Sequence, residues 1–186
     1  MLTGVVIIGV LLILVLYVMS TYNKFIRLKN NGDEAYAQLD AHLKQRYDLI
    51  PNLVETVKGY AKHEEKTLTA VIQARNIAAG AKSVGEKDKA EHALEGTLKT
   101  LFAVAESYPE LKANKNFENL QNELTRLEKE ILQARKYYNA VVKTFNTSIE
   151  VFPGSLIAGF FGSKFQKMTY LENTNEERQN VKVSFS

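Results

Sequence analysis

The strongest constraint on this fold is an apolar run near the N-terminus, GVVIIGVLLILVLYVM, which occupies residues 4–19 and carries no charge. Every Lys, Arg, Asp and Glu follows it, beginning at Lys24. About 17–25 apolar residues, rising about 1.5 Å each, cross the hydrocarbon core of a bilayer. We therefore predict a transmembrane anchor over residues 1–21, with Tyr17 and Tyr22 near the membrane interface. The first predicted partner is thus the lipid bilayer.

A cleaved signal peptide is the alternative interpretation of this segment. A secretory signal has a positively charged start and a shorter apolar stretch, whereas Met1, Leu2 and Thr3 carry no side-chain charge. Val18-Met19-Ser20 resembles a weak cleavage site, so this alternative stays open.

The basic residues around the anchor predict its orientation. Lys24, Arg27 and Lys29 follow the anchor closely, and no basic residue precedes it. The positive-inside rule then predicts a single-pass protein with its N-terminus outside and its body in the cytoplasm. The alternative is that these three side chains only lie on anionic headgroups, which would suit either face of the membrane.

Composition excludes several classes of function for the rest of the chain. The net charge is +3, and acidic and basic residues are interspersed, which argues against a nucleic-acid partner. The chain has no Cys, so it has no disulfide, no thiolate nucleophile and no sulfur-based metal site. After the anchor, its length suits one ordinary domain.

The body of the chain has the apolar periodicity of long helices. The longest stripe follows a 3-4-3-4 spacing typical of a coiled-coil seam. Its members are Phe117, Leu120, Leu124, Leu127, Ile131, Ala134, Tyr138, Val141, Phe145 and Ile149. We predict helices at 5–47, 49–79, 88–107 and 116–150, and hence an all-α fold in which a single-pass transmembrane helix precedes an up-and-down four-helix bundle.

The predicted bundle covers residues 22–152, and its connections follow turn-forming residues. Pro51 marks either a kink or a reversal of the chain. Residues 80–88 and 109–116 read as connections, with Asn114 or Asn116 capping the last helix.

A C-terminal segment with a different composition follows over residues 153–186. Gly154, Gly159 and Gly162 make a regular helix doubtful there, and alternating residues at 181–185 suggest a short strand. The segment carries large apolar side chains beside Lys164 and Lys167, which suits a contact with a membrane or a protein partner. The alternative is that these residues pack back onto the bundle. They are Leu156, Ile157, Phe160, Phe161 and Phe165.

Six polar residues lie on or beside the predicted apolar stripes: Asn52, Arg75, Glu128, Arg135, Asn139 and Asn146. A buried charge needs a partner. One interpretation is that Arg75, Glu128 and Arg135 form interhelical pairs that fix helix register. The other is that these residues line a groove that binds a partner.

No pattern of catalytic residues is present. His63-Glu64-Glu65 begins like a zinc-protease motif, but Thr67 stands where the second histidine is required. Nucleophile-elbow, phosphate-loop and dinucleotide fingerprints are missing from the sequence. We therefore predict a protein that is not an enzyme, with no metal and no cofactor.

The sequence resembles the LemA family of bacterial membrane proteins. The residues that carry the resemblance are YNKFIRLKN at 22–30, LDAHLKQRYDLIPNLVETVKGYAKHE at 39–64, ESYPELKANKNFENLQNEL at 106–124 and LEKEILQARKYYNAVVKTFNTSIEVFP at 127–153. The resemblance implies an N-terminal anchor in the bacterial inner membrane and a four-helix bundle. It implies no catalytic activity, since none is established for that family.

Together these observations predict a membrane-anchored scaffold or adaptor. An anchor confines the bundle to a surface and raises its effective concentration for partners there. Predicted partners are further copies of the chain, through the seam of the last helix, and a membrane protein. The alternatives are an accessory or regulatory subunit of a membrane enzyme such as a protease, and a membrane-remodelling protein.

Overall fold

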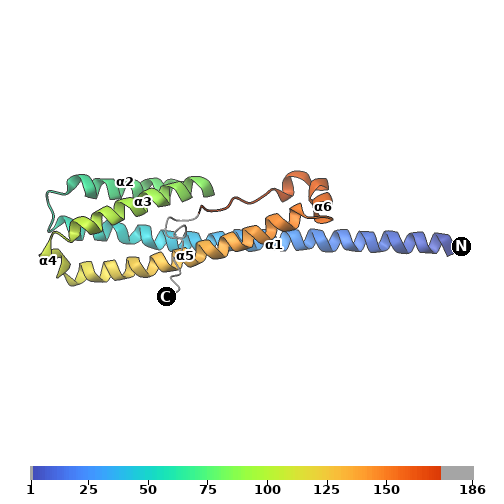
Figure 1. The fold of residues 1–186 in the computed structure, drawn as a ribbon, viewed down its shortest axis with the longest axis horizontal. Coiled ribbons are helices and arrows are strands. Elements are labelled where there is room, and N and C mark those ends of the chain that lie inside the picture. Colours follow the sequence, from blue (N-terminus) through green and yellow to red (C-terminus); the bar gives the residue numbers. More distant parts are fainter. Residues whose placement is uncertain (1, 173–186) are drawn as a thin grey trace, which may run out of the picture. The chain divides into compact units, whose positions relative to one another are not determined.

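The computed structural model describes residues 2–172, and every element in that part of the chain is helical. The elements in chain order are α1 (Leu2–Lys58), α2 (Glu65–Gly80), α3 (Val84–Ala105), α4 (Pro109–Lys112), α5 (Lys115–Glu150), α6 (Gly154–Phe160) and the 3-10 helix η1 (Gly162–Phe165) (Figure 1). The predicted all-α fold class is confirmed. The strand predicted at 181–185 lies outside the described residues.

The described chain packs into two compact units. The first, here called the anchor-side unit, contains residues 2–39 and 134–169. The second, here called the bundle unit, contains residues 40–133 and 170–172. Helices α1 and α5 each contribute residues to both units. The units therefore reflect which residues pack together and do not follow the order of the chain. The division into anchor (1–21), bundle (22–152) and tail (153–186) stays a prediction.

Four long helical segments and the short α4 build the bundle unit in the described chain. The long segments are the C-terminal part of α1, α2, α3 and the N-terminal part of α5. Only residues 81–83 connect α2 to α3, and these two helices pack along each other (Figure 1). Short connections of this kind make antiparallel neighbours. The core of the unit consists of fully buried aliphatic side chains from every helix: Ile50, Leu53, Val57, Val71, Leu94, Leu101, Leu111 and Leu127.

Helix α1 continues through Pro51, so the predicted helix boundary between residues 47 and 49 is wrong, and so is the alternative of a chain reversal there. A proline inside a helix leaves the carbonyl four residues earlier without its usual N–H partner. Here that carbonyl belongs to Tyr47, and Arg75 Nε of α2 donates to it at 3.1 Å. A side chain from the neighbouring helix thus replaces the missing backbone hydrogen bond.

The chain reverses at residues 59–64, inside the helix predicted over 49–79. Gly59 directly follows the last residue of α1, and its amide still donates to the carbonyl of Glu55 at 3.3 Å. The turn closes with hydrogen bonds from the amides of Tyr60 and Ala61 to the carbonyl of Val57, at 3.0 and 2.8 Å.

Polar caps define the starts of the next two long helices. Helix α3 begins at Val84, inside the predicted loop 80–88, because Ser83 and Glu86 form a reciprocal capping box. Its two hydrogen bonds, Glu86 N to Ser83 Oγ and Ser83 N to Glu86 Oε2, are both 3.2 Å. Asn114 caps α5 and accepts from the amides of Asn116 and Phe117 at 2.8 and 3.1 Å, which confirms one of the two predicted caps.

The predicted helix 116–150 is confirmed within one residue at its start. Most of its apolar stripe is buried: Phe117, Leu124, Leu127, Ile131, Tyr138, Phe145 and Ile149. The predicted connection 109–116 contains the short α4, in which Pro109 occupies the first turn. Tyr108 before it is extended, with φ −119° and ψ 90°, as the following proline favours.

The glycine-containing segment after α5 is helical, contrary to the expectation. Gly154 and Gly159 lie within α6. A Cβ on Gly154 would lie 2.4 Å from the carbonyl oxygen of Ser148 and 3.2 Å from Phe25, so glycine permits a close approach of the backbone. Within residues 2–172, Gly162 is the one residue with a positive φ, +56°, and it begins η1.

Candidate functional site

The apolar surface of α1 is the first candidate site. Residues 2–20 are exposed along their whole length, and none is covered by the rest of the chain. The most apolar stretch of this helix has a mean hydropathy of 2.9 and is long enough to cross a membrane. Contiguous apolar surface of this size marks a site of interaction with lipid or protein. The helix therefore has the length and composition of a membrane anchor.

A second apolar surface lies on α6 and η1, within the anchor-side unit. The five apolar candidates of the C-terminal segment divide into two groups there. Ile157 and Phe165 are buried in a core with Phe25, Phe145, Ile149 and Ala158, and Phe161 packs against the same core. Leu156 and Phe160 are 67% and 85% exposed.

Aromatic rings join this segment to α1. The ring of Phe161 lies 4.8 Å from that of Tyr22, and the ring of Phe165 lies 5.2 Å from that of Phe25. Both pairs are tilted or edge-on, which are the favourable geometries for aromatic rings. Lys164 Nζ donates to the Tyr22 hydroxyl and lies 5.0 Å from the centre of the Tyr22 ring. The segment is thus fixed to the first turn of α1 after the predicted anchor.

The extended residues that follow η1 are held by side chains of α5. Asn146 donates to the carbonyl of Met168 and accepts from its amide, both at 2.9 Å. The Tyr138 hydroxyl donates to the carbonyl of Thr169 at 2.9 Å. Burial raises the pKa of Tyr138 to about 12, with smaller contributions from Tyr36 and Asp33, so the hydroxyl keeps its proton at neutral pH.

The bundle unit contains a buried ion network, of which only Glu128 was singled out from the sequence. Arg46 is 2% exposed and pairs with Glu91 of α3 and Glu128 of α5. The Tyr47 hydroxyl donates to Glu91 as well. Spacing offered one signal, since Arg46 lies three residues after Leu43 and four before Ile50, on the buried face of α1. Its partners come from distant helices: Glu128 lies beside a predicted apolar stripe, whereas Glu91 was not singled out from the sequence.

One further ion pair and one histidine–carboxylate contact join the same helices of the bundle unit. Lys87 of α3 pairs with Asp40 of α1. His42 Nδ1 of α1 lies 3.3 Å from Glu130 Oε2 of α5. Charges of opposite sign on facing helices penalise a shifted register, because a shift leaves buried charges without partners. The network is suited to fixing the register of α1 against α3 and α5.

The six polar candidates are distributed over both units, and the buried Asn146 lies in the anchor-side unit. Arg75 and Glu128 lie in the bundle unit, where Arg75 caps the Tyr47 carbonyl and Glu128 pairs with Arg46. Arg135 and Asn139 lie in the anchor-side unit, buried and half-buried. Asn52 is exposed on α1. The register and groove interpretations of this set stay predictions.

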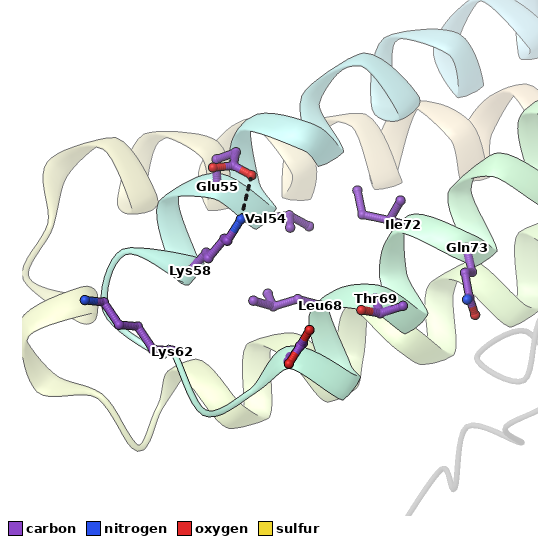
Figure 2. Close-up of a pocket in the computed structure, with 9 residues that line it drawn as sticks. Val54, Glu55, Lys58, Lys62, Leu68, Thr69, Ile72 and Gln73 are labelled. Atoms are coloured by element: carbon purple, nitrogen blue, oxygen red, sulfur yellow. Dashed lines mark ion pairs between the residues drawn. The ribbon is translucent and has the colours of Figure 1, made fainter.

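A groove of about 590 Å³ lies in the bundle unit between the end of α1 and α2 (Figure 2). Its apolar lining comes from Val54, Leu68 and Ile72, and its remaining residues are polar or charged. Lys58 Nζ lies 3.7 Å from Glu55 Oε1 on one side. Figure 2 shows Lys62 on the turn at one end of the groove and Gln73 near the other. The groove suits apolar side chains held within a polar rim.

The His, Asp and Glu side chains of the bundle unit form hydrogen bonds and charge pairs with other residues of the chain. In residues 2–172, no group of three or more His, Asp and Glu side chains is placed to hold a metal ion. His63, the start of the incomplete zinc motif, is exposed in the turn between α1 and α2. The adjacent Glu64 accepts from the Tyr108 hydroxyl at 3.1 Å, and partial burial with this contact raises the pKa of Tyr108.

Comparison with known proteins identifies the family. A model of the LemA family matches residues 35–185, well over half of the chain. Protein LemA of Metamycoplasma hominis is similar to this chain, with 28% identity over 140 residues. That match covers 73% of this chain and 63% of the relative, so the chain spans less than two thirds of that protein. The match over most of its length shows that the chain belongs to the LemA family.

Proposed function

We propose that this chain is a membrane-anchored, non-enzymatic scaffold or adaptor. The observation that carries the proposal is the complete exposure of residues 2–20, which continue without interruption into a helix of the folded body. Apolar surface of this extent is stabilised by lipid, and the charged body then stays at the membrane surface. Lys24, Arg27 and Lys29 favour a cytoplasmic location for that body at the inner membrane.

The pairing of buried charges supports a structural role for the polar residues. Arg46 is paired with two carboxylates, and Tyr47 donates to one of them. A catalytic group needs access to a substrate and a pKa matched to its task. Buried charges that pair with one another support a role in stabilising the bundle.

The groove between α1 and α2 is the surface that we propose for a partner. Its apolar residues would accept side chains of a membrane protein, while Lys58, Lys62, Glu55 and Glu65 would set orientation at its rim. Self-association remains part of the proposal. It would need surfaces other than the seam of α5, because most of that seam is buried within the chain.

Site-specific photo-crosslinking in native membranes tests this proposal. A photo-reactive residue replaces Gln73 in the groove, and a matched variant carries it at Asn76, which is exposed on α2 but does not line the groove. We expect a discrete crosslinked species from position 73 and little from position 76. A chain that stays monomeric at both positions and captures nothing would contradict a scaffold role.

A further inference from the structure

We infer that α6 and η1 form a second membrane contact, in which the exposed side chains of α6 insert into the headgroup region of the bilayer. The inference rests on the proposed function, because it takes residues 2–21 as the anchor. It assigns a ligand class, the lipid surface, to a segment that is separate from the transmembrane helix.

The first argument is the attachment of this segment to α1. Phe161 and Phe165 pack against Tyr22, with ring centres 4.8 and 5.5 Å apart, and Phe165 also packs against Phe25. Tyr22 directly follows the predicted anchor, and Phe25 lies about one helical turn beyond it. Figure 1 shows α6 beside this part of α1. If residues 2–21 cross the bilayer, α6 lies at the level of the headgroups.

The second argument is the distribution of apolar side chains. The inward residues Ile157, Ala158 and Phe165 are buried against α1 and α5. Outward lie Leu156 and Phe160, together with Val151 and Phe152 before the helix, and these four are between 52% and 85% exposed. Packing within the unit already buries the inward apolar side chains. The outward side chains form an exposed apolar surface of the kind that contacts lipid or a protein.

The third argument is the type and position of the cations. Lys164 follows the exposed residues of α6 and contacts the Tyr22 hydroxyl, while Lys24 and Arg27 are exposed on the adjacent turn of α1. Tyrosine and lysine side chains at the end of an apolar span occupy the headgroup layer. Apolar residues flanked by such cations are typical of segments that lie in the membrane interface. These neighbours favour lipid over a protein partner as the occupant.

Depth-dependent fluorescence quenching tests the inference directly. The chain contains no Trp, so each Trp substitution introduces a single reporter. The full-length Phe160→Trp variant is reconstituted into vesicles of phosphatidylcholine and phosphatidylglycerol whose acyl chains carry bromine near the headgroup or near the chain end. An interfacial helix inserts about 5–10 Å below the headgroup boundary. We expect blue-shifted emission and stronger quenching by the shallow bromines. Leu156→Trp is expected to behave in the same way.

Two matched variants separate this inference from the proposed anchor. Leu11→Trp reports the anchor and is expected to be quenched most by the deep bromines. Ile77→Trp replaces a residue of α2 that is 66% exposed, and is expected to emit as in water without quenching. Far-UV circular dichroism checks that all variants keep their helical content.

The outcomes distinguish the two proposals. If Leu11→Trp is quenched and Phe160→Trp behaves like Ile77→Trp, the second membrane contact is overturned and the anchor stands. If Phe160→Trp emits at short wavelength without quenching, the residue is buried against protein, which also overturns the inference. If neither Leu11→Trp nor Phe160→Trp is quenched, both proposals fail.

Discussion

In the anchor-side unit, Phe25 of α1 is surrounded by Phe145, Ile149 and Phe165, whereas in the bundle unit Arg46 of the same helix is surrounded by carboxylates. The first environment is apolar and tolerates small movements between rings. The stability of the second environment depends on the geometry of each pair, because a charge must have its partner at hydrogen-bond distance. The unit that contains the predicted anchor thus relies on aromatic packing, while the bundle unit adds specific pairing of charges.

The largest effect is expected from breaking the ion network. Arg46→Ala leaves Glu91 buried without its cation and Glu128 without its partner. Removal of one member of a buried ion pair lowers the free energy of unfolding by about 3–5 kcal/mol. Urea unfolding of the detergent-solubilised chain, followed by circular dichroism, measures this loss.

The matched control replaces the buried pair together. Arg46→Met combined with Glu91→Leu removes both buried charges and keeps side-chain volume, so its free energy of unfolding should exceed that of Arg46→Ala. If Arg46→Ala unfolds at the same urea concentration as the unaltered chain, the network does not stabilise the bundle unit.

A somewhat smaller effect is expected in the aromatic core of the anchor-side unit. Phe165→Ala removes a ring that packs against Tyr22 and Phe25, and truncation of a buried Phe lowers the free energy of unfolding by about 3–5 kcal/mol. We expect a value near the lower limit, because η1 is a short element that can relax. Hydrogen exchange should show faster exchange in α6 and η1 with bundle-unit protection retained. Uniform loss across both units would contradict the division into two packing units.

The third expected effect concerns the residues held by α5. Asn146→Ala removes two hydrogen bonds to the backbone of Met168, which corresponds to about 1–3 kcal/mol of local stability. Exchange of the Met168 amide should accelerate. Thr144→Ala, an exposed change on the same helix, is the control and should leave that amide protected. Equal exchange in both variants would show that Asn146 does not hold this segment.

A smaller effect is expected at the start of α3. Ser83→Ala removes the N-cap of the helix and lowers the free energy of unfolding by about 1 kcal/mol. Thermal unfolding measures the change. Lys82→Ala, a neighbouring exposed change outside the cap residue, should have little effect. A Ser83→Ala chain as stable as the unaltered chain would remove the capping box from the account.

The smallest effect is the pH dependence of that capping box. Hydrogen bonds from Ser83 and Lys82 lower the pKa of Glu86 below its ordinary value of 4.5. A lowered carboxyl pKa contributes stability above pH 4.5 that is lost as the pH falls through the folded-state value. Glu86→Gln keeps a capping side chain without a titratable group. Its stability should therefore decline less between pH 5 and pH 3, the range that thermal melts would compare.

The local patterns of the sequence predicted the long helices, but not every boundary. The stripe from Phe117 to Ile149 predicted α5 within one residue, because an amphipathic helix repeats its apolar residues at a fixed spacing. The boundary at Pro51 was wrong because the compensating donor, Arg75, comes from another helix. The start of α3 was a missed local signal, since Ser83 and Glu86 have capping-box spacing.

The candidate site was also predictable only in part, because contacts between distant segments decide which of its residues are buried. The apolar load of residues 156–165 was evident, but their division into buried and exposed sides depends on Tyr22 and Phe25, which lie more than 100 residues earlier in the chain. Likewise Glu128 was identified as a polar residue beside a stripe, while its partner Arg46 was not. Partners across helices follow from three-dimensional packing and leave no periodic trace in either helix.

Alkaline carbonate extraction of native membranes, combined with mass spectrometry of the intact chain, tests the central claim most directly. If residues 2–21 anchor the protein in lipid, the chain stays in the membrane pellet and its mass includes the apolar segment. A chain that is released into the supernatant, or that begins near Thr21, would contradict the account.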